Sequence, residues 1–131
     1  MNRKLSANVD DILSLLKSSI DDVSHNSEDK IFKLLDGNGY LLLSIIHSEK
    51  YSFFLRSHAA RVFFSYPVFY KDDIDSYIEN IVEHCSAFIR LGVVYGLCYA
   101  ERYCDLEFYF LNDTSSNVRE EVEEILLDKE L

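Results

Sequence analysis

Several groups of residues have side chains that could do chemistry, and the first is a cluster of oxygen donors. Asp36-Gly37-Asn38-Gly39 has the spacing found inside a calcium-binding loop. The first ligand of such a loop would be Leu34 and the twelfth would be Ile45, so two decisive oxygen ligands are missing. Two glycines and an asparagine instead tolerate the positive φ of a tight turn. We therefore predict a hairpin turn and no calcium site.

The cysteines and the histidines form no recognisable site either. Cys85, Cys98 and Cys104 lack the short paired spacing of a structural zinc site. Their odd number and apolar surroundings favour reduced thiols in the cytosol. Ser57 and His58 are adjacent, but consecutive side chains of a strand point to opposite faces. We therefore expect no nucleophilic dyad.

The remaining catalytic patterns are incomplete. Glu79 and Glu83 are spaced so that both fall on one helix face, as paired carboxylates need, but the polar neighbours Ser76 and Asn80 indicate a solvated face. The glycines of Gly92-x-x-x-Gly96 are not followed by the lysine of a nucleotide-binding loop. We predict that the chain is not an enzyme and that it holds no cofactor and no metal.

The charge of the chain limits its partners. Its 131 residues include 13 Lys and Arg against 23 Asp and Glu, a net charge of −10. This balance argues against nucleic acids and anionic membranes and favours a basic protein partner. The acidic residues concentrate in residues 8–30, 72–83 and 118–131. The acidic residues that we predict to contact the partner are Asp72, Asp73, Asp75, Glu79, Glu120, Glu121 and Glu124.

Apolar residues at three- and four-residue steps predict three amphipathic helices. They cover residues 9–23, 74–91 and 117–127, and Gly92 is suited to end the second of them. No apolar run reaches the roughly 20 residues of a membrane-spanning helix, and the N-terminus lacks the apolar run of a signal peptide. We expect a cytoplasmic protein.

The segments between these helices are rich in β-branched and aromatic residues, which favours strands. The predicted strands cover residues 31–35, 40–46 and 51–56, with 61–66 as another strand or a continuation of the third. A second hairpin is predicted over 93–111, although 93–103 could instead prolong the preceding helix. The fold class predicted from this pattern is α+β: an antiparallel sheet flanked by helices, in the order α-β-β-β-α-β-β-α. The length fits one domain, residues 1–131.

Eight of the eighteen Phe and Tyr residues fall within residues 51–70. On a sheet that helices cover on one side only, alternate rings would lie on an open face. Large exposed apolar patches mark interaction sites. We therefore predict that Phe53, Phe63 and Tyr66 contact the partner.

Three segments carry a resemblance to a known family: Asp36–Leu43, the helix Ile74–Leu91, and Leu106–Phe110 leading into Asn117–Leu127. In element order, size and acidity the chain resembles the type III secretion chaperone-like superfamily. The resemblance implies a homodimer built on helix 74–91 that holds an unfolded segment of one secreted effector along apolar grooves.

Two hypotheses about function follow. In the first, the chain is a non-catalytic bacterial binding module, similar to a chaperone, that holds one partner polypeptide. In the second, it is an immunity protein whose carboxylates mask the basic active site of a cognate toxin domain.

Overall fold

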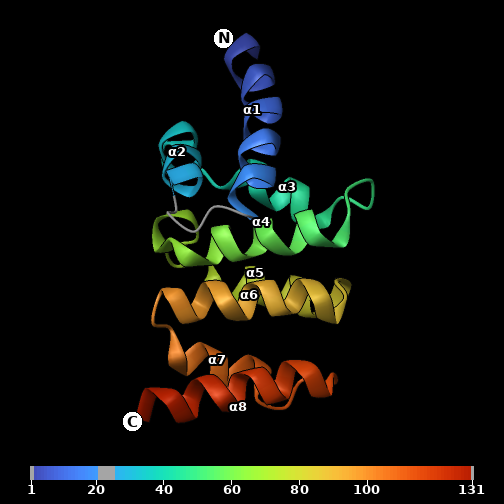
Figure 1. Ribbon diagram of the computed structural model, residues 1–131, viewed down its shortest axis with the longest axis vertical. Helices are drawn as coiled ribbons and strands as arrows, with labels where there is room; N and C mark the ends of the chain where they lie inside the picture. Colours follow the sequence, from blue (N-terminus) through green and yellow to red (C-terminus); the bar gives the residue numbers. More distant parts are fainter. Residues whose placement is uncertain (1, 21–25, 131) are drawn as a thin grey trace.

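The computed structural model describes residues 2–20 and 26–130. Every regular element in these ranges is helical, and Figure 1 shows their arrangement. The elements are α1 (Asn2–Ile20), α2 (Asn26–Leu35), α3 (Tyr40–His47), α4 (Phe53–Ser65), the 3₁₀ turn η1 (Pro67–Phe69), α5 (Ile74–His84), α6 (Ala87–Tyr99), α7 (Tyr103–Phe110) and α8 (Ser116–Glu130). No helix among these residues is long and apolar enough to cross a membrane.

The predicted α+β fold is wrong, because the described residues contain no strand. The segments predicted as strands 31–35 and 40–46 lie in α2 and α3, and residues 53–56 and 61–65 of the next two lie in α4. The predicted hairpin over 93–111 is the end of α6 followed by α7. Part of this error has a physical reason: α4 lacks a clear helical period because neighbouring helices bury it on more than one side. Nine of its thirteen residues are buried.

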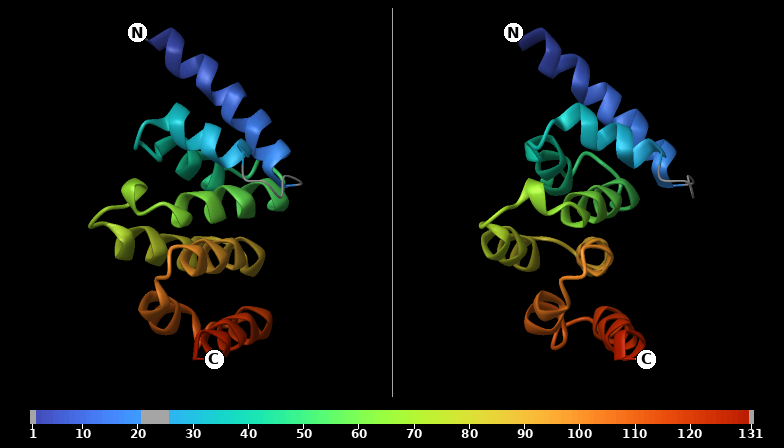
Figure 2. Two further views of the ribbon diagram at one scale, coloured as in Figure 1. Left: turned by 60° about the vertical axis from the view of Figure 1, so that its left-hand side comes forward. Right: turned by 90° about the vertical axis from the view of Figure 1, so that its left-hand side faces the viewer.

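The helices stack in two layers. In the right-hand view of Figure 2, α3, α5 and α7 lie on one side and α4, α6 and α8 on the other. The ends of the chain, marked N and C, lie at opposite ends of the stack (Figure 1). One buried apolar cluster runs through it, from Ile12 in α1 to Val122 in α8.

Two glycines let α4 and α6 pack at backbone distance. A Cβ atom on Gly92 would overlap the backbone carbonyl group of Ser57. A Cβ atom on Gly96 would lie 2.6 Å from the carbonyl oxygen of Arg61. Any larger residue at either position would push the two helices apart. The spacing Gly92-x-x-x-Gly96 is thus a helix-packing feature.

The helix predicted over 74–91 is two helices, α5 and α6, separated at Cys85 and Ser86. Arg90 Nη1 donates a hydrogen bond to the carbonyl oxygen of Cys85, 2.8 Å away, which satisfies an acceptor at the end of α5. Gly92 lies inside α6 and does not end a helix. The helices predicted at either end of the chain are present as α1 and α8, and the predicted residues 21–23 of the first lie outside the described ranges.

Ion pairs join the outer parts of the stack to α4 and α6. The Arg90 guanidinium makes a bidentate pair with the Asp113 carboxylate, with both N···O distances 2.9 Å, and both side chains are buried. Asp113 lies in the connection before α8, so the pair fixes that connection against α6. At the other side of the centre, Arg61 Nη2 lies 2.7 Å from the buried carboxylate of Glu28 in α2.

Candidate functional site

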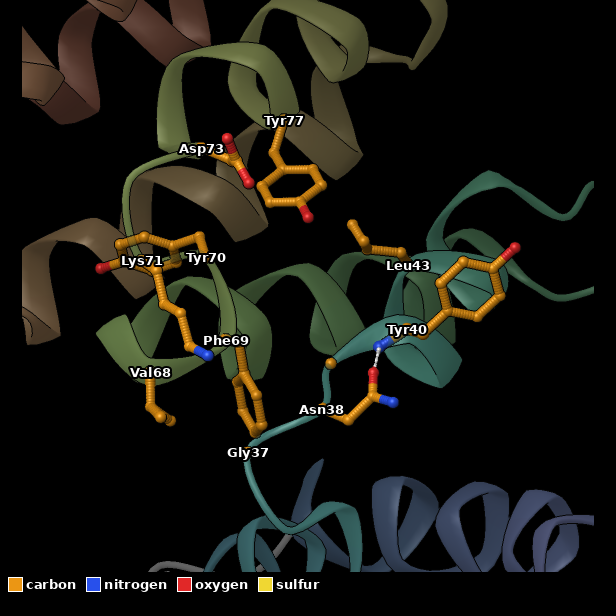
Figure 3. A pocket seen from close by; sticks show the side chains of 11 residues that line it. Gly37, Asn38, Tyr40, Leu43, Val68, Phe69, Tyr70, Lys71, Asp73 and Tyr77 are labelled. Carbon is orange, nitrogen blue, oxygen red and sulfur yellow. Dashed lines mark hydrogen bonds between the residues drawn. The ribbon is translucent and has the colours of Figure 1, made fainter.

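Figure 3 shows a pocket of about 320 Å³ where the starts of α3 and α5 meet the turn that follows η1. Leu43 and Phe69 form apolar parts of its lining, and the Tyr77 hydroxyl points into it. Lys71 and Asp73 bring opposite charges to its lining. No buried side-chain polar atom among the described residues lacks a hydrogen-bond partner, so none marks this pocket as a ligand site.

The segment with the spacing of a calcium loop borders this pocket as a turn between two helices. Asp36 and Gly37 both have positive φ, 49° and 82°, and Asn38 Oδ1 accepts a hydrogen bond from the Tyr40 backbone N–H. The turn is therefore present, although it joins helices and the predicted hairpin is wrong. Within the described ranges, no three His, Cys, Asp or Glu side chains group as metal ligands.

A second surface lies over α4 and α6, where large rings are exposed. Phe54 is 68% exposed and its ring meets that of Phe88 edge to face, with centroids 5.1 Å apart. Tyr95 and Tyr99 continue this row along α6, seven and eleven residues after Phe88. We call the surface formed by these four side chains the aromatic face.

A shallow pocket of about 200 Å³ opens within the aromatic face. Ser57 and Gly92 line it where the two helices meet, and Phe54, Phe88 and Tyr95 also line it. Ser57 Oγ donates to the backbone carbonyl oxygen of Phe88, at 3.0 Å. The hydroxyl proton is therefore already used, and the inner surface of the pocket behaves as largely apolar.

His58 also borders this pocket but is engaged elsewhere. Its Nε2 is hydrogen-bonded to the Ser19 hydroxyl of α1, and its Nδ1 accepts a long hydrogen bond of 3.4 Å from Arg61 Nε. Burial first, and then the charge of Arg61, lower the pKa of His58 to about 4. The imidazole is therefore neutral at pH 7. Ser57 and His58 bond to different partners, and no hydrogen bond is recorded between their side chains.

Carboxylates border the aromatic face on the side of α8. Burial, followed by the charge and hydrogen bond of Glu121 and the charge of Glu124, raises the pKa of Tyr95. Burial and then Glu121 raise the pKa of Cys98 as well. Tyr66 has its pKa raised to about 12, first by burial and then by Glu28. The groups around this face therefore feel a negative field.

The cysteines and the paired glutamates have ordinary environments. Cys85 is buried, with Sγ 3.9 Å from His47 Nδ1, and burial raises its pKa. Cys104 is exposed. Glu79 and Glu83 are both exposed on α5, and Glu83 lies 3.9 Å from the ring of His84.

The residues predicted to contact a partner do not form one surface. Phe63 is fully buried and stacks on Phe69, so the open sheet face expected for it does not exist. Phe53 is exposed in the first turn of α4, with the Arg56 guanidinium over its ring. Tyr66 is half-buried and its ring meets that of Tyr99, 6.2 Å away, at the end of the aromatic face.

The predicted acidic residues divide between the two layers. Asp75 accepts a hydrogen bond of 2.6 Å from the Tyr109 hydroxyl and so joins α5 to α7. Glu121 and Glu124 lie beside Tyr95 at the aromatic face. The others are exposed: Asp72, Asp73 and Glu79 at or near the start of α5, and Glu120 on α8.

The sequence analysis missed Phe88, Tyr95 and Tyr99 as surface residues. The apolar stripe of the helix predicted over 74–91 includes Phe88 and so places its ring in the core. The spacing of seven and four residues between the three rings is the signal that could have found them, because it puts them on one face of a single helix. That signal depends on recognising α6 as continuous from Ala87 to Tyr99.

Comparisons with protein-family models, with curated proteins and with solved structures find no match for this chain. The resemblance to the type III secretion chaperone-like superfamily has no matching relative to support it, and the α+β fold that it implied is not the one observed.

Proposed function

We propose that this chain is a non-catalytic protein-binding module that holds one partner polypeptide against its aromatic face. The supporting observation is that Phe54, Phe88 and Tyr95 expose their rings around one pocket, whereas scattered single exposed rings need no explanation. Tyrosine and phenylalanine are enriched in protein interfaces because they provide much contact area at a low entropic cost.

The chemistry around the pocket supports binding more than catalysis. A nucleophile would need a base within hydrogen-bond reach, and Ser57 donates to a backbone carbonyl while His58 is bonded to Ser19.

A specific observation favours the second hypothesis about function, inhibition of a basic toxin. Glu121 and Glu124 belong to α8, which packs against α6 beside the aromatic face, so a partner that covers the rings would also meet carboxylates at its edge. Such carboxylates attract a cationic partner and speed its association. The exposed rings still support the chaperone hypothesis, but the open sheet face that it assumed is absent from the described residues.

The experiment is co-expression of the full chain with the product of each gene adjacent to its own, followed by size-exclusion chromatography and calorimetry. We expect one of these products to form a stoichiometric complex. Changing Phe54, Phe88 and Tyr95 together to Ala should remove the complex. Phe108→Ala is the matched control, because Phe108 is 79% exposed but lies on α7 in the other layer.

Each outcome of this experiment tests a different part of the proposal. A complex that survives the triple substitution would show that the aromatic face is not the binding surface. A chain that binds neither product would contradict the proposal. Turnover of a small substrate by the purified chain would contradict its non-catalytic part.

A further inference from the structure

The pocket in the aromatic face suits a single side chain of a partner, which we call the anchor, better than a whole small molecule. Its volume of about 200 Å³ is below the roughly 300–1,000 Å³ of typical small-molecule sites. Ser57 and Gly92 form its inner part, and neither offers an unsatisfied polar group that a small polar ligand would need. Interfaces commonly gain much of their affinity from one bulky side chain that fills such a pocket.

The charges around the pocket indicate what should flank that side chain. Arg61 is the one cation that lines it among the described residues, and Arg61 is paired with Glu28. On the other side, α8 packs against α6 and carries Glu121, which is half-buried, and Glu124, which is exposed; after burial, both raise the pKa of the Tyr95 hydroxyl. A partner residue beside the anchor would therefore meet negative charge. Lysine or arginine would be favoured there, and a second copy of this chain, with its net charge of −10, would be repelled.

The row of rings sets the length of the contact. Phe88 and Tyr99 are eleven residues apart on α6, which corresponds to roughly 16 Å along the helix axis. A partner segment of about eleven helical residues, or about five extended residues, would cover this distance. The contact is therefore with a short segment of the partner.

We propose that the pocket bordered by Phe54, Phe88 and Tyr95 receives one bulky apolar side chain of a partner segment whose flanking lysine or arginine residues face Glu121 and Glu124. This inference rests on the proposed function and specifies the chemistry of the partner. It predicts a short recognition motif, one apolar anchor with neighbouring cations, that is sufficient for measurable binding.

The test is selection of a displayed library of random twelve-residue peptides against the full chain. We expect the enriched peptides to share one Phe, Leu, Ile, Met or Trp next to at least two Lys or Arg. For a selected peptide, Phe54→Ala combined with Phe88→Ala should raise the Kd by about tenfold or more. Glu121→Gln combined with Glu124→Gln should raise the Kd several-fold and reduce its dependence on salt.

Matched controls come from the other layer of the stack. Phe108→Ala and Glu107→Gln change an exposed ring and an exposed carboxylate of α7 and should leave the Kd unchanged. Circular dichroism and thermal melting of every variant show whether it is folded. All of these substitutions are at exposed or half-exposed positions, so we expect them to fold.

Three results would overturn the inference: no enrichment, enriched peptides without cations, or a Kd that the aromatic and acidic substitutions do not change. If the peptides fail while a neighbouring gene product binds and the triple substitution removes it, the proposed function stands and the anchor motif is wrong. If the peptides bind as expected but no gene product does, the anchor site stands and the proposed partner is wrong.

Discussion

The middle of the stack and its two sides are held together by different chemistry. Between α4 and α6, Gly92 and Gly96 bring backbones into contact and the surrounding side chains are apolar. On the α1 and α2 side, the apolar contacts are joined by two polar ones, His58 with Ser19 and Arg61 with Glu28. On the α8 side, the buried Arg90–Asp113 pair is added to the apolar contacts of Val118 and Val122. Apolar contacts are insensitive to pH, whereas charged pairs change with pH, so the two regions should respond differently to the same perturbations.

The largest loss of stability should come from breaking the buried Arg90–Asp113 pair. Asp113→Ala leaves the Arg90 guanidinium buried without its carboxylate and should lower the free energy of unfolding by about 3–5 kcal/mol. Urea unfolding measures this. The matched control is Asp105→Ala, which breaks the more exposed Arg102–Asp105 pair and should cost less than about 1 kcal/mol. Equal losses in the two variants would show that burial does not distinguish these pairs.

The second-largest loss of stability should come from acidification, which weakens the contact of His58 with α1. The pKa of His58 is about 4 in the folded chain and 6.5 in the unfolded chain, so the unfolded chain binds the proton more tightly. Stability is therefore full above pH 6.5 and falls as the pH drops toward 4, by up to about 3 kcal/mol. Urea unfolding between pH 7 and pH 5 shows the onset. His58→Gln should flatten this dependence and His84→Gln, at an exposed position, should not; the same slope in all three chains would contradict the assignment.

The stability of the contact between α4 and α6 should depend on side-chain size at Gly92 and Gly96 and hardly on pH. Gly92→Ala places a methyl group against the Ser57 carbonyl, and after the gain of about 1 kcal/mol in helix propensity it should still destabilise the chain by about 2 kcal/mol. Gly96→Ala should cost less, because its nearest contact is longer. Thermal and urea unfolding at pH 5 and pH 7 measure both. A stabilising Gly92→Ala would show that the helices can separate without cost.

The smallest loss of stability is expected for the exposed rings of α4 and α6. Phe54→Ala and Phe88→Ala should each change the free energy of unfolding by less than about 1 kcal/mol, because these rings are exposed and lose mainly their edge-to-face contact. The double variant measures the coupling between them. A loss above about 2 kcal/mol for either ring would mean that it belongs to the structural middle and is not free to serve as a binding surface.

The sequence predicts helices correctly where a long segment carries one continuous apolar stripe. The apolar stripes in 9–23 and 117–127 correspond to α1 and α8 at the outer parts of the stack. In α4, by contrast, Ala59, Ala60 and Val62–Ser65 are all buried, so apolar residues follow one another without a helical gap. Short apolar runs of this kind do not distinguish a strand from a buried helix, and β-branched and aromatic residues then favour the wrong choice.

The candidate site was predictable only in part, for the same reason. Glu121 and Glu124 were singled out by charge, which needs no knowledge of the fold. The surface rings depend on how α4 and α6 face each other, and this is fixed by Gly92 and Gly96. Assigning Phe63 to the surface followed directly from treating 61–66 as a strand, whereas in α4 the same side chain points into the core.

The glycine contact also fixes the register of α6. Each residue turns an α-helix by about 100°, so the positions that face α4 and the positions that carry the exposed rings keep a constant angle to each other. Inserting one residue between Phe88 and Gly92 would rotate the ring of Phe88 away from the row formed by Tyr95 and Tyr99 while the glycines stayed in place. The segment of α6 from Phe88 to Tyr99 must therefore keep its length if the four rings are to share one face.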